Sequence, residues 1–249
     1  MNVIECTELG KRYRRTWALR NCTLSIPAGH VVALVGPNGA GKTTLLNLAV
    51  GLATSTTGAV SVLDGIPAGS PDALDRIAFV AQDAPLYKNL PAGDMLQVAR
   101  NLNRRWDDQR ARTRLASLRI PLNKKVGQLS GGQKAQLALT IALARRPDLL
   151  VLDEPLAALD PLARHEFMQS VMETAAADGI SVVLSSHVVA ELERVASYLI
   201  VLSSGQVTVS GKADELVAAR STSQHRTSLE QIVLASMRES ETSGREVAA

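Results

Sequence analysis

The chain has 249 residues, of which 46% are hydrophobic, 20% charged and 3% aromatic, and its net charge is +3. This is an ordinary balance for a single globular domain, and a core rich in Ala, Val and Leu suits helices packed on a parallel sheet. No apolar segment approaches the ~20 residues that cross a bilayer, and residues 1–11 lack the basic start and long apolar run of a signal peptide. We therefore expect a cytosolic protein and exclude an integral membrane or secreted one.

The first part of the chain predicts an antiparallel β layer. Residues 3–9, 22–26 and 30–35 have the composition of short strands, and residues 27–29 form the clearest tight turn between them. Residues 11–17 are predicted to form a polar loop that carries two of the few aromatic residues. Cys6 and Cys22 lie in the predicted strands without metal-ligand spacing, so we expect reduced, partly buried thiols.

A glycine-rich loop follows the third strand directly. It reads Gly36-Pro37-Asn38-Gly39-Ala40-Gly41-Lys42-Thr43 and leads into the helix-forming residues 44–48. Glycines allow a tight turn with inward-pointing N–H groups, and the start of the helix adds unpaired donors and a positive dipole end. This is the pattern of a P-loop, in which Lys42 reaches the β- and γ-phosphates and the Thr43 hydroxyl completes the coordination of Mg²⁺. An exposed aromatic ring on the loop 11–17 would stack on a base bound nearby.

The middle of the chain predicts a small helical insert. After strands at 58–63 and 77–81, residues 92–125 have helical periodicity, with Met95, Val98, Ala99 and Leu102 on one stripe and a second helix that begins near Asp107. Residues 96–125 hold nine Lys or Arg and two Asp, a local charge of +7 that leaves −4 for the rest. Such a basic face indicates an anionic neighbour, either lipid headgroups or acidic loops of a partner, and a solvated helical surface explains it equally well.

A second glycine-led helix follows the insert. Leu129-Ser130-Gly131-Gly132-Gln133 opens an Ala- and Leu-rich stretch that should be helical to Arg145 and stop before Pro147. Glycines at a helix start leave N–H groups open to an anion, which predicts a second phosphate site. Two distant loops of one chain cannot easily wrap one γ-phosphate, so a second copy of the chain would supply the other half.

Two later strands end in polar residues. Residues 149–152 form a buried strand that ends at Asp153-Glu154, where Asp153 would hold Mg²⁺ and Glu154 would orient and deprotonate the attacking water. Residues 180–185 deliver His187 to the same edge of the sheet, where it would contact the γ-phosphate or the water.

The end of the chain predicts a hairpin and a polar tail. The segments 198–202 and 206–210 close the fold as a hairpin, and the chain beyond about 216 is rich in Ser, Thr, Arg and Glu. A capping box at 228–231, followed by apolar residues at helical spacing, predicts a short terminal helix in this otherwise mobile tail.

Together these motifs resemble the nucleotide-binding subunits of ATP-binding cassette (ABC) transporters, over residues 2–215. The most specific mark is the segment 129–133, which resembles the family signature that separates ABC proteins from other P-loop enzymes. The resemblance implies an α/β fold: a P-loop NTPase core with a mixed or parallel sheet, the N-terminal antiparallel β layer, and a helical subdomain at about 92–145. The domains expected are residues 1–215 and a polar C-terminal tail, 216–249.

The resemblance also assigns the site residues. It places Tyr13 where an aromatic ring stacks on adenine, Gln82 where Mg²⁺ and the membrane partner are sensed, and His187 at the switch histidine. Asp153 and Glu154 match the metal-site and catalytic acids, and 159–160 match the end of the loop that crosses the dimer interface. The expected catalytic residues are Glu154, His187 and Lys42, and the expected metal ligands are Thr43, Gln82 and Asp153. The expected nucleotide-binding residues are Tyr13, Gly36, Pro37, Asn38, Gly39, Ala40, Gly41, Lys42, Thr43, Thr44, Gln82, Ser130, Gly131, Gly132 and Gln133.

Two positions depart from the usual pattern. Ala157 stands where many members have Ser, which removes one cross-dimer hydroxyl contact, and Ala81 stands where proline more usually precedes the glutamine. Neither removes a charged catalytic group, so we expect activity to survive.

The resemblance implies that two cassettes, identical or related, sandwich two ATP molecules with Mg²⁺, and that their closure moves separate transmembrane permease subunits. We expect a cytoplasmic protein, peripheral on the inner face of the cell membrane, with an anionic-lipid contact and no nucleic acid. The compact insert and the segment 228–237 resemble bacterial cassettes of antibiotic or peptide exporters.

Two alternatives belong to other classes. A soluble ABC ATPase acting on nucleic acid or the ribosome usually carries a long coiled-coil insertion or two fused cassettes, and this sequence has neither. A nucleotide kinase with a chance signature needs an acceptor pocket, for which the sequence offers no sign.

Overall fold

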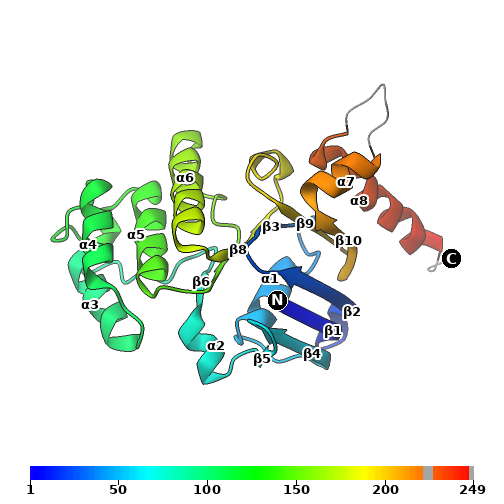
Figure 1. Cartoon of the computed structure of the whole chain (residues 1–249), viewed down its shortest axis with the longest axis horizontal. Helices are drawn as coiled ribbons and strands as arrows, with labels where there is room; N and C mark the ends of the chain where they lie inside the picture. The colour runs from blue at the N-terminus through cyan, green and yellow to red at the C-terminus, as the bar shows by residue number, and fades with distance from the viewer. Residues whose placement is uncertain (221–226, 247–249) are drawn as a thin grey trace.

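The computed structural model describes residues 1–220 and 227–246, and it contains two β-sheets flanked by helices (Figure 1). The parts of the predicted tail at 221–226 and 247–249 lie outside the described residues. One sheet has four strands in the order β2-β1-β4-β5, and the other has six in the order β10-β9-β3-β8-β7-β6. The α/β fold with an antiparallel N-terminal layer is therefore confirmed.

The smaller sheet is antiparallel and contains the strands β1 (Asn2–Tyr13), β2 (Thr16–Pro27), β4 (Thr57–Val62) and β5 (Ile66–Pro67). The prediction of a polar loop at 11–17 was wrong. β1 and β2 pair up to Tyr13 and Thr16, so only Arg14 and Arg15 form the turn. Arg14 adopts a φ of 53°, the left-handed conformation that a tight hairpin turn needs.

The larger sheet contains β3 (Val31–Val35), β6 (Ile77–Val80), β7 (Leu149–Leu152), β8 (Ser181–Ser186), β9 (Tyr198–Ser203) and β10 (Gln206–Lys212). The third predicted strand does not belong to the antiparallel layer, because β3 pairs in parallel with β8 and β9. All five residues of β3 are buried, as expected of a parallel strand covered on both faces. The predicted C-terminal hairpin is confirmed by the antiparallel pairing of β9 and β10.

Two apolar clusters cover the two faces of the larger sheet. α1 (Lys42–Ala49) and the antiparallel sheet share a cluster with one face. The opposite face packs with α5 (Gly131–Ala144), α6 (Pro161–Asp178) and the C-terminal helix. The short helix α2 (Pro71–Arg76) leads into β6. The sequence reading had not included α2 or α6.

The insert forms its own apolar cluster. It comprises α3 (Ala92–Leu102), α4 (Asp108–Ser117), the 3-10 helix η1 (Val126–Gln128) and α5, which also belongs to the main core. α4 begins near Asp107 as predicted, with Asp107 as its cap, and Ser130 caps α5 as predicted. Met95 and Ala99 are buried, whereas Leu102, expected on the same stripe, is 79% exposed because α3 ends there.

The C-terminal segment packs on the core. α7 (Ala213–Arg220) crosses the predicted boundary at 215, and α8 (Leu229–Glu246) is longer than the short helix expected. The predicted capping box is present, since Gln231 N donates to Ser228 Oγ at 3.2 Å and Ser228 N donates to Gln231 Oε1 at 3.0 Å. α8 packs against β9, β10 and the 3-10 helix η2 (Val189–Glu191).

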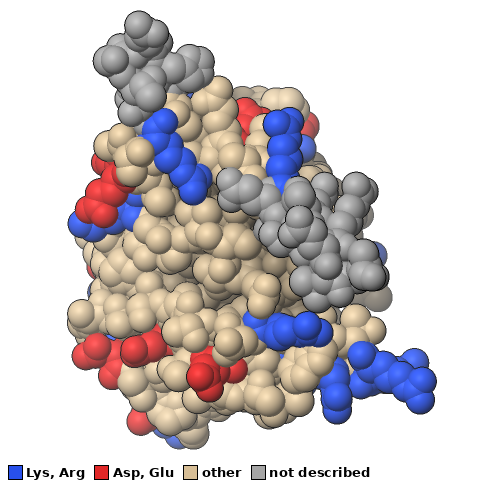
Figure 2. Space-filling model, turned by 90° about the vertical axis from the view of Figure 1, so that its right-hand side faces the viewer, with Lys and Arg blue, Asp and Glu red and all other residues tan. Residues whose placement is uncertain are grey.

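Charge on this side is scattered. Figure 2 shows the face next to the C-terminal helices, where Lys and Arg lie in separate groups around a broad uncharged area.

Two further expectations concern membrane spans and thiols. Among residues 1–220 and 227–246, no helix is both long enough and apolar enough to span a bilayer.

Cys6 and Cys22 are free, buried thiols, and burial raises the pKa of Cys6 to about 12. Burial also raises the pKa of Cys22, so both thiols are protonated near neutral pH.

The core position of Phe167 on α6 gives a test of this packing. Phe167 is 1% exposed, so Phe167→Ala should leave a cavity and lower the free energy of unfolding by about 3–5 kcal/mol. Urea titration followed by circular dichroism measures the change. The control on the same helix is Leu162→Ala, because Leu162 is 67% exposed. Equal shifts of the unfolding midpoint for both variants would contradict the assigned packing.

Candidate active site

The glycine-rich loop connects β3 to α1, as the sequence predicts. Gly41 adopts a φ of 104° directly before α1, and a Cβ there would lie 2.5 Å from the Ala18 carbonyl oxygen. A Cβ on Gly36 would lie 2.2 Å from the Leu202 carbonyl oxygen. Only glycine fits these two positions, so the loop stays close to β9 and the first N–H groups of α1 face the open side.

Lys42 lies inside the loop. Its side chain is 6% exposed, and Nζ donates to the carbonyl oxygens of Gly36 at 2.8 Å and Pro37 at 3.3 Å. Nζ also lies 3.3 Å from Glu154 Oε1. Because a buried ammonium group needs a compensating charge, the Glu154 carboxylate is the group that balances it here.

Glu154 follows the end of β7 and has an unusual backbone. Its φ is 47°, and its N–H donates to Ser185 Oγ at 2.8 Å, while the Ser185 hydroxyl donates to Asp153 Oδ1 at 2.7 Å. Ser185 therefore ties both acids to β8. Non-glycine residues in the left-handed region are strained and concentrate at functional sites, where the surrounding contacts hold them in place.

His187 completes a row of three charged or polar groups. Its Nδ1 lies 2.8 Å from Glu154 Oε2, so one carboxylate contacts Lys42 through one oxygen and His187 through the other. If Nδ1 carries the proton and donates to the carboxylate, Nε2 of a neutral ring is an acceptor. The sequence prediction placed His187 at this edge but gave it no contact with Glu154.

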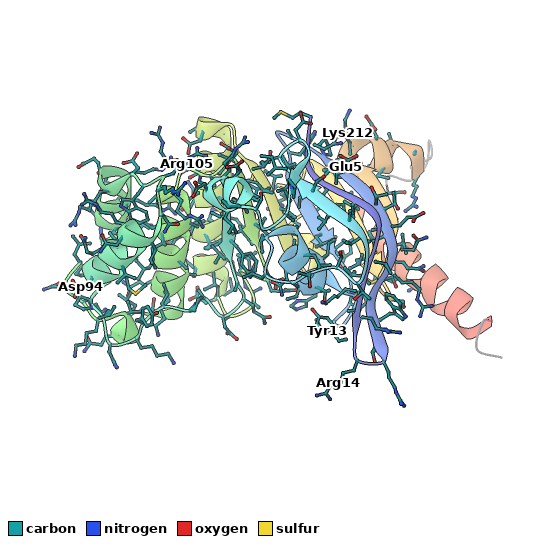
Figure 3. The ribbon with its side chains drawn as sticks, turned by 90° about the horizontal axis from the view of Figure 1, so that it is seen from below. Glu5, Tyr13, Arg14, Asp94, Arg105 and Lys212 are labelled. Carbon is teal, nitrogen blue, oxygen red and sulfur yellow. The ribbon has the colours of Figure 1, made fainter. Side chains whose placement is uncertain are left out.

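These residues surround a cavity of about 400 Å³. Tyr13, which is 49% exposed, forms one wall at the end of the hairpin whose tip carries Arg14 (Figure 3). The cavity is lined by Tyr13, Ala18, Asn38, Gly39, Ala40, Gly41, Lys42, Thr43, Thr44, Gln82, Glu154 and His187. Gly36 and Pro37 of the predicted loop lie outside the lining, but their carbonyl oxygens accept hydrogen bonds from Lys42. Asp153 also lies outside the lining and is 2% exposed.

The structure adds two residues that the sequence reading had not assigned to the site. Ala18 contributes to the cavity wall because β2 lies close to Gly41. No sequence pattern predicts this contact. Ser185 had a signal in the sequence, because it ends the predicted strand 180–185 at the same edge as the two acids. In the structure it is buried, and its strand pairs in parallel with the strand of the acids.

The second glycine-led helix lies outside this cavity. Ser130 Oγ accepts from Gln133 N at 3.1 Å, and the Gln133 side chain accepts from Ser130 N at 3.2 Å. Ser130, Gly132 and Gln133 line a different cavity of about 200 Å³, with Asp160 and Ala163 at the start of α6. Within one chain, the two predicted phosphate sites are therefore separate.

The residues present fit a nucleotide and a divalent cation. The cradle offers the start of a helix, close-packed glycines and a buried ammonium group, which together select a phosphate group. Thr43 and Gln82 in the lining, and the buried Asp153 next to Glu154 in the chain, are oxygen donors of the kind that Mg²⁺ takes.

Comparison with known proteins agrees with this site. The family described as "ABC transporter" matches residues 19–157, more than half of the chain. The lantibiotic transport ATP-binding protein SrtF of Streptococcus pyogenes is 32% identical over 222 residues, which cover 85% of this chain and 92% of SrtF. The molybdenum import ATP-binding protein ModC of Vibrio parahaemolyticus is 34% identical over 203 residues, which cover 79% of this chain and 55% of ModC.

A solved structure extends the likeness to three dimensions. The dimeric structure of a post-hydrolysis state of an ATP-binding cassette, bound to ADP and Pi, superposes with a TM-score of 0.73 at 29% identity. The match covers 84% of this chain and 98% of that one. With the loop, the two acids and the glycine-led helix in place, the chain belongs to the ABC transporter family of ATP-binding subunits, whose cassettes are ATPases.

Proposed function

We propose that the chain binds MgATP at the cradle of Lys42 and hydrolyses it with Glu154, inside a dimer of cassettes that drives separate permease subunits. The observation that carries the proposal is the position of Glu154, whose carboxylate lies 3.3 Å from Lys42 Nζ and 2.8 Å from His187 Nδ1. A base at the phosphate cradle, held between a cation and an orienting imidazole, suits attack of water on a γ-phosphate.

The residues divide the work as follows. The loop amides and Lys42 bind the β- and γ-phosphates, and Glu154 accepts the proton of the water whose oxygen bonds to the γ-phosphorus as ADP leaves. His187 orients the Glu154 carboxylate through Nδ1 and contacts the terminal phosphate. Thr43, Gln82 and Asp153 would hold Mg²⁺, which supplies neutralisation of the phosphate charge.

The second cassette completes the site. Ser130, Gly131, Gly132 and Gln133 start a helix outside the cavity of their own chain, so in our proposal they cover the γ-phosphate bound by a partner cassette. Every element of both halves is present in this chain, which allows two identical copies to pair.

Export is the proposed direction, with the protein peripheral on the inner face of the cell membrane. Support comes from the likeness of the compact insert and the segment 228–237 to antibiotic or peptide exporter cassettes, and from a relative named as a Nod factor export ATP-binding protein. The molybdenum import relative shows that the two directions share this cassette. We also propose residues 1–215 as the nucleotide-binding domain, with the insert at about 92–145 and a C-terminal segment from 216.

A contact with anionic lipid rests on fewer residues than the sequence indicates. Arg104, Arg105 and Arg110 pair with Asp75, Asp148 and Asp178, which all lie outside the insert segment 96–125. Arg112 pairs with Asp108 inside the insert. Arg114 donates to Thr140 Oγ1 at 3.2 Å and Gln136 Oε1 at 2.9 Å on α5. Of the nine basic residues, the other four remain, and in our proposal the lipid contact is made by Arg100, Arg119, Lys124 and Lys125.

Removal of the base should separate binding from turnover. Glu154→Gln keeps the shape of the side chain but removes its charge, so ATP hydrolysis should fall by at least about 100-fold while ATP binding persists. Phosphate release and nucleotide titration measure the two quantities, and gel filtration with ATP should show accumulated dimers. Glu5→Gln, on an exposed position of β1, should leave turnover unchanged. Normal turnover in Glu154→Gln would refute the role of Glu154.

Mixing two inactive variants tests the shared site. Lys42→Ala loses the cradle and Ser130→Glu loses the covering helix start, so each alone should be inactive. In a random mixture, each mixed dimer has one intact composite site, and activity should return to at most about a quarter of the unmodified protein. A mixture no more active than its separate components, although mixed dimers form on cross-linking, would place both elements in one chain's site.

The stacking role of Tyr13 predicts a small loss of affinity. Tyr13→Ala should weaken ATP binding by about 1 kcal/mol, or roughly fivefold, while Tyr13→Phe retains the ring and the affinity. Calorimetric titration measures the difference, and Tyr87→Ala is a control because Tyr87 is exposed but does not line the cavity. Unchanged affinity in Tyr13→Ala would exclude stacking on this ring.

A further inference from the structure

A second concave site lies at the opposite edge of the larger sheet. Asp148 and Ile180 precede the strands β7 and β8, whereas Glu154 and His187 follow the ends of the same strands. A cavity of about 600 Å³ is lined there by residues that include Arg105, Trp106, Arg110, Arg146, Asp148 and Asp178. We call it the arginine cavity. Its volume is in the range of small-molecule sites.

The arginine cavity joins the insert to the core. Arg105, Trp106 and Arg110 come from the segment between α3 and α4 and from α4 itself, and the other named residues come from the segments before β7 and β8. A backbone hydrogen bond of 2.8 Å from Asp107 N to Ala144 O crosses close by. Figure 3 shows Arg105 where the insert meets the rest of the chain.

Positive charge exceeds negative charge at this cavity. Arg105 and Arg76 share one oxygen, Asp148 Oδ2, at 3.4 and 2.5 Å, and Arg110 pairs with Asp178 at 2.5 Å. Burial raises the pKa of Asp148, but hydrogen bonds from Arg76 and Arg105 outweigh burial and lower it, so this carboxylate stays ionised. Three guanidinium groups (Arg105, Arg110 and Arg146) and two carboxylates line the cavity. Arg76 pairs with Asp148 from outside the lining, so the whole group of arginines and aspartates carries a surplus of two positive charges.

Arg146 is the arginine of this cavity whose charge is not balanced by an ion pair among the described residues. It is exposed, lines the cavity, and has no ion pair among the residues that the structure describes. Its φ of 51° is a left-handed conformation that a long side chain rarely adopts, held by Arg146 N donating to Leu143 O at 3.0 Å. The indole of Trp106, half-buried beside these arginines, gives the cavity a flat apolar wall.

We propose that the arginine cavity binds a phosphomonoester dianion carried on an organic group. The surplus of two charges matches the −1.5 to −2 of such a group near pH 7. Guanidinium forks bind phosphate oxygens in pairs, and Trp106 can cover the organic part. The same chemistry occurs on a soluble phosphorylated metabolite and on the headgroup of phosphatidic acid. Either ligand would bridge the insert and the core.

The experiment uses Trp106 as its own reporter in the full chain. Trp17→Phe leaves Trp106 as the single tryptophan, and Lys42→Ala removes the cation of the nucleotide cradle, so binding there does not interfere. Phenyl phosphate should change Trp106 fluorescence saturably, and phenyl sulfate, with the same shape but one charge, should bind about tenfold more weakly. Cosedimentation with phosphatidylcholine vesicles, with and without phosphatidic acid, tests the lipid source.

The double substitution Arg105→Gln and Arg146→Gln should weaken binding by at least about tenfold. Arg15→Gln, in the exposed hairpin turn, removes one charge away from the cavity and should leave binding within about twofold. Arginine-dependent binding of phenyl phosphate alone assigns a soluble ligand, and arginine-dependent binding to phosphatidic acid vesicles assigns a lipid headgroup. Binding to neither probe, or equal binding by the arginine variants and Arg15→Gln with melting temperatures unchanged, overturns the proposal.

Discussion

One carboxylate organises the site. Glu154 reaches Lys42 with one oxygen and His187 with the other, while its strained backbone is held by the hydroxyl of Ser185. These contacts exist because β3, β7 and β8 are parallel neighbours whose carboxyl ends meet at one edge. A slip of one residue in any of these pairings would direct the side chains to the other face and disperse the site.

The same architecture leaves the site open on one side. The cradle lies between the two sheets and the hairpin, whereas the Ser130 helix start belongs to the insert and lines another cavity. In the dimer that we propose, binding of the substrate would be coupled to association, because the groups that complete the site would come from a second protein. In such a dimer, ATP hydrolysis would depend on the association of two cassettes rather than on a conformational change within one cassette.

Local signals in the sequence predicted most of this arrangement. The glycine loop, the helix start near Asp107, the cap at Ser130 and the buried strand before Asp153 each depend on neighbours in the chain, and each lies where expected. The failures needed information about distant partners. The polarity of residues 11–17 hid a pair of long strands stabilised by cross-strand contacts, such as Arg12 over the Trp17 ring. The run 31–35 looked like the neighbouring strands until its parallel pairing with β8 and β9 was seen.

The local charge counted along the sequence was the least reliable guide to the folded surface. The nine basic residues of the insert give a dense positive run in the sequence, but three of them are balanced by acids from distant segments. Composition counts charges along the chain, while a surface is formed by whatever folding places side by side.

The packing of α8 has a consequence for the far end of the chain. Glu193, just beyond η2, accepts a hydrogen bond of 2.9 Å from Leu229 N at the first turn of α8, and buried side chains of both segments share one cluster. The segment that follows His187 is therefore held against α8 by this hydrogen bond and by apolar packing. A molecule that docked against α8 would therefore contact a helix that is bonded to a segment only a few residues from His187.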